Sequence, residues 1–104
     1  MDDRTFKETL ERAIHKYGDM MQMRQCIEEM AELTQAISKY QRAYSEEEVE
    51  KAIDNLIEEI ADVHIMVQQM IMIIMRLFSD EGRGRINYQI EYKVNRLRER
   101  IENE

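Results

Sequence analysis

The chain has 104 residues, a net charge of −7 and a pI near 4.9, and these values limit its size class and its partners. A chain of this length forms a single domain, residues 1–104, and a domain this small is often stabilised by self-association. The acidic balance argues against nucleic-acid binding as the main role, because nucleic-acid-binding proteins usually carry a basic surface. With no proline and only three glycines, the composition favours an all-α fold.

The single cysteine and the N-terminal segment both bear on the compartment. Cys26 has no second cysteine to pair with, which excludes an intrachain disulfide and a CxxC metal site. The first residues, MDDRTFKETLERAI, begin acidic and lack a continuous apolar run, so we expect no signal peptide. A reduced, cytoplasmic setting fits both observations.

Start and stop signals predict two helices in the first part of the chain. Thr5 followed by Glu8 forms a capping box that opens a short first helix, and this helix ends near Gly18. The second helix then runs from about residue 19 to residue 43. Its start follows the glycine directly, so we expect only a tight connection between the two helices.

Two further helices are predicted in the second part. Ser45 followed by Glu48 forms another capping box, which opens a long third helix that reaches about residue 78. The segment SDEGRGR, residues 79–85, contains two of the three glycines and predicts a break. The last helix covers roughly residues 86–101. No linker is long enough to divide the chain into domains.

The second half of the third helix, VHIMVQQMIMIIMRLF at residues 63–78, is apolar enough to raise the question of a membrane span. Four polar side chains interrupt it, and a span needs about 20 clean residues, so we expect no membrane contact. A helix that is apolar nearly all round is otherwise buried on several sides. We therefore expect helix-on-helix oligomerisation, with Ile65, Met72 and Met75 at a subunit interface.

Apolar residues at helical spacing indicate which side of each long helix faces the core. The apolar arc of the second helix comprises Ile27, Met30, Ala31, Leu33 and Ile37. The core stripe of the third helix comprises Val49, Ile53, Leu56, Ile60, Val63, Val67 and Ile74.

Acidic residues lie at the margins of both arcs. In the second helix, Glu29 falls near the edge of the arc, Glu32 lies roughly 60° further round, and Glu28 is further out. In the third helix, Glu59 and Asp62 also lie about 60° apart, in a sector that turns apolar one turn later. We therefore expect Glu59 and Asp62 to be partly buried.

Either acidic pair alone would usually be a solvated helix face, but two pairs on adjacent helices require an explanation. Crowded, buried carboxylates are strongly destabilising unless cations neutralise them. No basic residue occupies the same sectors, and Lys39, two turns after Glu32, is the nearest candidate. Divalent Mg²⁺ or Mn²⁺ fits better, because hard cations take oxygen ligands. His64 lies one residue outside this register, and we expect a core histidine rather than a ligand.

The two acidic motifs in this order resemble those of a known family. EEMAE, Glu28–Glu32, fits an EExxE motif, and EIAD, Glu59–Asp62, fits the ExxD that follows it. The chain resembles the MazG-type all-α nucleoside triphosphate pyrophosphohydrolases, whose superfamily includes dimeric dUTPases and phosphoribosyl-ATP pyrophosphatases. The resemblance covers about residues 20–101 and includes the flanking segments ELTQAISKY, ADVHIMVQQ and YKVNRLRER.

This resemblance implies an all-α, four-helix MazG-like bundle that is completed by oligomerisation as a homodimer or homotetramer. It also implies roles for particular residues. The catalytic acids would be Glu28, Glu29, Glu32, Glu59 and Asp62, of which the last four would be the Mg²⁺ ligands. The residues that reach the substrate triphosphate would be Lys93, Asn95, Arg96 and Arg100. A solvated basic helix face is the alternative interpretation of these four residues.

The implied reaction is hydrolysis of a (deoxy)nucleoside triphosphate to the monophosphate and pyrophosphate, as in house-cleaning of the nucleotide pool. An acidic protein could bind this anionic substrate through the metal ions. No Ser-His-Asp or Cys-His arrangement is apparent, so we expect no covalent intermediate. Two alternatives stay open: a non-catalytic helical interaction module, and a related dUTPase or phosphoribosyl-ATP pyrophosphatase activity. The sequence does not identify the base.

Overall fold

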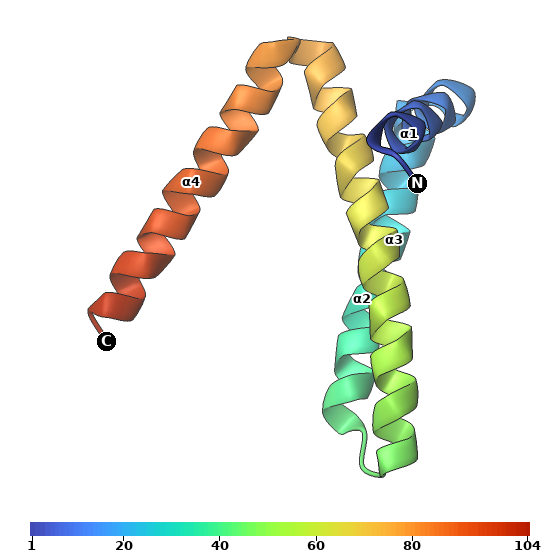
Figure 1. Ribbon diagram of the computed structural model, residues 1–104, viewed down its shortest axis with the longest axis vertical. Coiled ribbons are helices and arrows are strands. Elements are labelled where there is room, and N and C mark those ends of the chain that lie inside the picture. The colour runs from blue at the N-terminus through green and yellow to red at the C-terminus, as the bar shows by residue number, and fades with distance from the viewer. The chain divides into compact units, whose positions relative to one another are not determined.

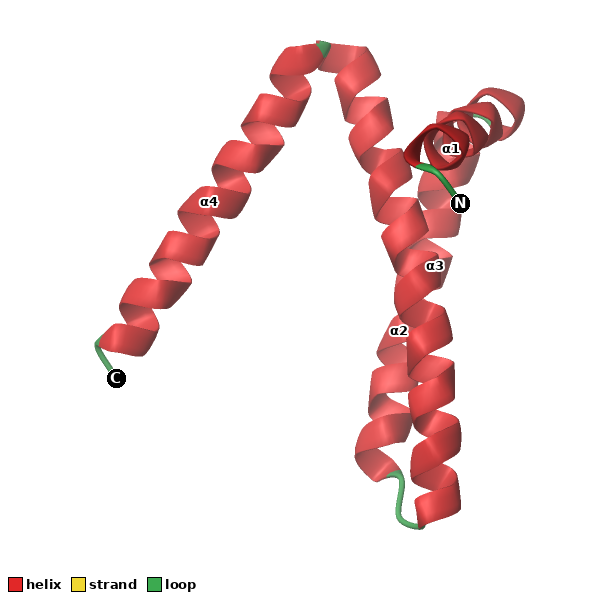
Figure 2. Ribbon diagram, viewed as in Figure 1, coloured by secondary structure: helices red, strands yellow, loops and turns green.

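A computed structural model describes all of residues 1–104 and shows an all-α protein without strands (Figure 2). The four helices are α1 (Asp3–Tyr17), α2 (Asp19–Arg42), α3 (Glu46–Phe78) and α4 (Asp80–Glu102). The predicted all-α class and the four predicted helices are confirmed. The chain divides into two compact units, residues 1–70 and residues 71–104, so the first unit contains α1, α2 and most of α3.

The helix α1 begins earlier than predicted, because Asp2 rather than Thr5 caps it. The Asp2 side chain accepts a hydrogen bond from the Thr5 backbone N–H at 2.7 Å, which also lowers the pKa of Asp2. The predicted box of Thr5 and Glu8 is therefore wrong, and Glu8 instead pairs with Arg4 at 3.1 Å. At the other end, Gly18 has a φ of 89°, a conformation that favours glycine, and connects α1 directly to α2.

The turn between α2 and α3 contains the second predicted capping box, which is confirmed. The Glu48 backbone N–H donates to Ser45 Oγ at 3.1 Å, and the Glu48 carboxylate accepts the backbone N–H of Tyr44 at 2.9 Å. The side chain of Glu48 thus returns to the residue before the cap. The predicted limits of the second and third helices agree with the structure within two residues.

The predicted break within residues 79–85 is confirmed at Ser79, but it is shorter than predicted because the chain turns at this single residue. Ser79 has a φ of 54°, and α4 begins directly after it and includes both Gly82 and Gly84. A Cβ at Gly82 would lie 3.0 Å from the carbonyl oxygen of Ile74. Gly82 therefore permits close packing between the end of α3 and the start of α4, within the second unit.

In the first unit, α2 and α3 run side by side in opposite directions (Figure 1). α1 packs against α3, where buried Gln69 donates to the carbonyl oxygen of Leu10 at 3.4 Å. The ring of Phe6 lies 6.4 Å from that of His64. His64 is exposed, so its predicted core position is wrong.

The most deeply buried residues of α2 and α3 in the first unit are mostly small or polar, and none belongs to the predicted apolar arcs. The residues that are buried on these helices within the first unit are Gln22, Cys26, Ala36, Ala52, Met66 and Gln69. Ala36 and Ala52 have almost no side-chain volume, so they let the two helices approach closely. This close approach is what brings the acidic residues of the two helices together.

The predicted arcs are partly wrong for the single chain, since many of their residues are exposed. Ile37 is 44% exposed and Ile60 is 53% exposed, although both were expected in the core. We call the line along which α2 and α3 meet the contact line; Ala36 and Glu59 lie on it. Ile37 and Ile60 each follow one of these residues by one position, about 100° further round the helix. We name six of these exposed residues the apolar face: Ile27, Met30 and Ile37 of α2, and Ile53, Ile60 and Val67 of α3.

The apolar face lies on one side of the α2–α3 hairpin. Both helices are right-handed and run in opposite directions, so a step of one residue past the contact line leads to the same side in each. Ala36 precedes Ile37 and Ala52 precedes Ile53, which places both isoleucines on that side. Water-exposed apolar residues in such a continuous arrangement mark an interaction surface.

By length and composition alone, α3 could cross a membrane. An 18-residue window reaches a mean hydropathy of 1.4, and 17% of it is buried within the chain. A single helix of this kind is weak evidence for a membrane span, because the core helices of soluble bundles have the same character.

Candidate metal centre

Two acids from α2 and two from α3 converge at the contact between these helices. Glu29 and Glu32 are three residues apart, as are Glu59 and Asp62, so each pair shares one helix face. One carboxylate oxygen from each residue lies within 4.8 Å of those of the others. Glu32 is exposed and the other three are half-buried, which confirms the expected partial burial of Glu59 and Asp62.

The residues next to the acids along the contact line explain why the acids face one another. Cys26 and Met66 are buried on one side of the cluster, and Ala36 and Ala52 are buried on the other. Once these four side chains are packed between the helices, the side chains on the turns between them, at the same helix positions, must also face the partner helix. The acids are thus held at the contact by the packing of their neighbours.

The protein itself satisfies only part of the hydrogen-bonding capacity of these carboxylates. Gln25 Nε2 donates to one oxygen of Glu29 at 2.8 Å, but the other Glu29 oxygen is buried without a partner. One oxygen of Glu59 is also buried without a partner. None of the four acids forms an ion pair with a lysine or arginine. Buried acceptors without donors are rare in proteins, so these two oxygens are open to a cation or a proton.

The pKa values of two of the acids are raised. Burial is the main cause of the raised pKa of Glu29, which the Gln25 hydrogen bond opposes and the nearby charges of Asp62 and Glu32 reinforce. Burial is also the main cause for Glu59, followed by the charges of Glu32, Asp62 and Glu29. Without a cation, the cluster therefore resists full ionisation.

The donor set indicates which ions could bind here. All four side chains offer oxygen atoms, and no histidine or cysteine belongs to the cluster. Hard divalent cations such as Mg²⁺, Mn²⁺ and Ca²⁺ prefer oxygen ligands. A divalent cation would relieve the repulsion between the carboxylates and bind their unpartnered oxygens, so the residues fit such an ion.

The structure does not place Glu28 with the other predicted catalytic acids. Glu28 is exposed and lies outside the cluster, one position and about 100° from Glu29. His64 is also absent from the cluster, in agreement with the expectation that it is not a ligand. The structure thus brings together four of the five predicted catalytic acids.

The four residues predicted to contact the triphosphate lie on α4, in the second unit, and all are exposed. Lys93, Arg96 and Arg100 share one face of α4, and the Arg96 guanidinium lies 5.8 Å from the centre of the Tyr92 ring. Asn95 is two positions from Lys93 and therefore points to a different side of the helix. Their contact with a triphosphate stays a prediction.

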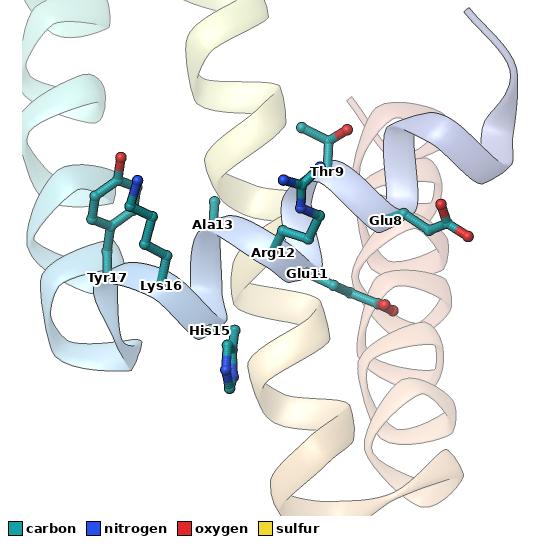
Figure 3. A pocket seen from close by; sticks show the side chains of 8 residues that line it. All are labelled: Glu8, Thr9, Glu11, Arg12, Ala13, His15, Lys16 and Tyr17. Atoms are coloured by element: carbon teal, nitrogen blue, oxygen red, sulfur yellow. The ribbon is translucent and has the colours of Figure 1, made fainter.

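A hollow of about 820 Å³ lies along α1 and has no apparent chemistry. Its lining side chains extend in different directions from a single helix (Figure 3). Side chains that diverge in this way cannot surround a ligand. We therefore assign no site to it.

Two polar features near the acidic cluster were not predicted from the sequence. Gln25 holds Glu29 by a hydrogen bond, and Gln69 is buried with its side-chain carbonyl oxygen unpartnered. Gln22, Glu29 and Ala36 are seven residues apart, as are Ala52, Glu59 and Met66. This seven-residue spacing, typical of paired helices, was a signal for the true contact line.

Comparison with known proteins finds no matching family model, no matching curated protein and no matching solved structure. The resemblance to MazG-type enzymes thus rests on the two acidic motifs and their flanking segments. Any function must be argued from the geometry and chemistry of the acidic cluster.

Proposed function

We propose that the protein is a Mg²⁺-dependent nucleoside triphosphate pyrophosphohydrolase, which converts a (deoxy)nucleoside triphosphate to the monophosphate and pyrophosphate. The observation that carries the proposal is the convergence of four carboxylates from two helices, two of them with buried, unpartnered oxygens. The order of the EExxE and ExxD motifs agrees with this reaction.

In this proposal Glu29, Glu32, Glu59 and Asp62 hold Mg²⁺, which Mn²⁺ could replace. When bound, the metal offsets phosphate charge and makes water a better nucleophile. A carboxylate of the cluster accepts the proton of the attacking water. The new bond forms between the water oxygen and the α-phosphorus, the bond from that phosphorus to the bridging oxygen breaks, and pyrophosphate leaves. No protein nucleophile is needed.

The proposal includes self-association through the apolar face. Large side chains such as Ile27, at 64% exposure, and Ile60, at 53%, would be buried by a second copy. Full burial of such a side chain contributes about 1.5–3 kcal/mol. Packing two α2–α3 hairpins together would complete a four-helix bundle in a homodimer, or in half of a homotetramer. The basic residues of α4 would then contact the triphosphate in the assembled enzyme.

A panel of canonical and modified nucleotides tests the reaction. The panel includes dUTP, dCTP and phosphoribosyl-ATP, with Mg²⁺, Mn²⁺ or excess chelator, and both products are measured. We expect metal-dependent release of equal amounts of monophosphate and pyrophosphate. Orthophosphate as the primary product would contradict attack at the α-phosphorus. No turnover of any nucleotide would favour a helical interaction module, which the exposed apolar face also suits.

A further inference from the structure

A second hollow, of about 520 Å³, lies at the tip of the α2–α3 hairpin and differs from the first in its chemistry. It is formed between the end of α2 and the beginning of α3, so both helices contribute side chains. The residues that line it are Lys39, Arg42, Ala43, Glu48, Lys51, Ala52 and Asn55. Three of these residues are cationic, in a protein whose net charge is −7.

The cations of this hollow are available to a ligand. Lys39 forms no ion pair or hydrogen bond within the chain. Lys51 pairs with Glu47 at 3.2 Å, but both side chains are more than three-quarters exposed, and such pairs contribute little to stability. Arg42 Nε makes one long hydrogen bond, of 3.4 Å, to a backbone carbonyl.

Two acids, Glu47 as the partner of Lys51 and Glu48 in the lining, offset only part of the positive charge of the hollow. Glu48 is the only acid in the lining, and one of its oxygens already accepts the Tyr44 N–H at 2.9 Å. Asn55 is half-buried and has an amide that can donate two hydrogen bonds. Three cations and a neutral donor against two acids leave an excess of positive charge, with Lys39 as the cation that has no partner.

The basic hollow and the metal centre lie on the same side of the α2–α3 hairpin. Lys39 follows Glu32 by seven residues, and Asn55 precedes Asp62 by seven residues. Seven residues make nearly two turns, so each pair shares a helix face and is separated by about 10 Å along the axis. Because the helices are antiparallel, both steps lead toward the tip of the hairpin.

We propose that the basic hollow binds the pyrophosphate end of the substrate while the α-phosphate lies at the acidic cluster. The inference rests on the proposed function and adds a binding site to it. Lys39 and Lys51 supply point charges that suit phosphate oxygens, and Asn55 supplies an amide donor. Because negative charge grows on the departing pyrophosphate, cations placed there stabilise the transition state as well as the bound substrate.

This arrangement gives the bound nucleotide a direction along the hairpin. The polyphosphate points toward the tip, and the nucleoside points toward the opposite end of the α2–α3 contact. At that end, Gln22 lies seven residues before Glu29, and Gln69 lies seven residues after Asp62. Both glutamines are uncharged and buried, and Gln69 donates to the Leu10 carbonyl oxygen of α1, so α1 lies beside the nucleoside end of this arrangement.

Binding of inorganic pyrophosphate tests the inference without requiring turnover. Isothermal titration calorimetry in Mg²⁺ would compare the wild type with Lys39→Ala, Lys51→Ala and the control Lys7→Ala, which removes an exposed α1 lysine. We expect about tenfold weaker pyrophosphate binding for Lys39→Ala and for Lys51→Ala, since each removes a charged hydrogen-bond donor. Lys7→Ala should bind as the wild type does. All three lysines are exposed, so the variants should fold.

Two results would overturn the inference: no binding of pyrophosphate by the wild type, or equal binding by all three variants. Either result leaves the proposed hydrolysis standing if the nucleotide panel shows metal-dependent turnover. Conversely, weakened binding by Lys39→Ala and Lys51→Ala supports the anion site even if no nucleotide is hydrolysed, and the proposed reaction alone then fails. In an active enzyme, the same two variants should also raise the inhibition constant of pyrophosphate.

Discussion

The two sides of the α2–α3 hairpin carry opposite chemistry although they are built from the same turns of the same helices. One residue past the contact line, the chain is apolar: Met30 follows Glu29, Ile37 follows Ala36 and Ile60 follows Glu59. Three residues past the contact line, it is polar: Glu32, Lys39, Asn55 and Asp62 lie there. A seven-residue repeat thus separates an apolar face from a face that can bind ions.

The two sides therefore differ in the kind of partner that would stabilise them. The polar side has carboxylate oxygens and one lysine, Lys39, without partners, and it would be stabilised by bound ions and phosphates. The apolar side has isoleucines in contact with water, and it would be stabilised by another apolar surface. Substitutions on one side should therefore affect ion binding and turnover, while substitutions on the other should affect assembly.

The largest expected effect is on the polar side, at Glu59. Glu59→Gln keeps the size of the side chain but removes a proposed ligand, so turnover should be abolished. In the wild type, Mg²⁺ at a hundredfold excess over its Kd should raise the free energy of unfolding by about 2.7 kcal/mol for one site. The variant should lose most of that gain. Thermal unfolding with and without Mg²⁺, alongside pyrophosphate release, measures both effects.

Glu58→Gln is the matched control, because it removes the same charge one position away, on an exposed side chain outside the cluster. It should keep wild-type turnover and metal-dependent stabilisation, since exposed substitutions usually change stability by about 0.5 kcal/mol or less. Asp62→Ala should behave as Glu59→Gln does. Retention of both properties by Glu59→Gln and Asp62→Ala would show that these residues are not ligands.

The next effect is on the apolar face, where Ile60→Glu should prevent assembly. A carboxylate in a dehydrated interface is strongly unfavourable, and the isoleucine also loses about 1.5–3 kcal/mol of burial. Sedimentation velocity of the wild type at micromolar concentration, without detergent, should show a dimer or tetramer. The Ile60→Glu variant should sediment as a smaller species or unfold.

Ile65→Glu makes the same change on the other side of α3, where the sequence had predicted a subunit interface. Ile65 is 36% exposed, less than Ile60, and it lies about 140° from Ile60. If the apolar face is the dimer interface, Ile65→Glu should still form a dimer. Dissociation by Ile65→Glu but not by Ile60→Glu would move the interface to Ile65, Met72 and Met75. A well-folded wild-type monomer would contradict both interfaces.

Much of the fold and the acidic cluster could be predicted because local signals encode them. The Ser45–Glu48 box and the two acidic pairs depend on residues within one turn, and the structure confirms them. The predicted start of α1 was wrong because two residues, Asp2 and Thr5, are both of a type that caps helices. The glycines near the start of α4 were predicted to lie in the break, whereas both belong to the helix and Gly82 packs closely against Ile74.

The contact line of the hairpin was harder to predict because hydrophobicity pointed to the wrong side. Isoleucines marked the side expected to be the core, but Ala36 and Ala52 mark the side where the two helices meet. Small residues contribute little to an apolar pattern, although they permit the closest approach. The basic hollow was missed for a related reason, since Lys39 and Asn55 come from different helices and meet only after folding.

A smaller effect is expected at the tip of the hairpin, where Ser45→Ala should lower the stability of the protein without a selective effect on either side. Loss of the cap hydrogen bond, 3.1 Å long in the structure, should lower the free energy of unfolding by about 1 kcal/mol. The increase in stability caused by Mg²⁺ and the assembly state should stay as in the wild type. This variant shows what a general loss of stability does to each assay. A selective loss of metal binding would instead link the cap to the site.

The smallest effect concerns pH, because the carboxylates of the cluster are only partly buried and solvent weakens their interactions. In the metal-free protein, the pKa values of Glu29 and Glu59 are raised above their ordinary value of 4.5. Between 4.5 and the raised values, the folded state binds more protons than the unfolded state, so these groups reduce stability as pH rises. Glu59→Gln removes one of these groups.

Without metal, the Glu59→Gln variant should therefore gain stability relative to the wild type at neutral pH, and the gain should shrink as the pH falls toward 4.5. Glu58→Gln should show no such trend, and saturating Mg²⁺ should reverse the gain, because a bound cation favours ionised ligands. Unfolding by urea at several pH values, with chelator or with Mg²⁺, measures the difference. A gain that instead grew on acidification would contradict burial and mutual repulsion as the source of the raised pKa values.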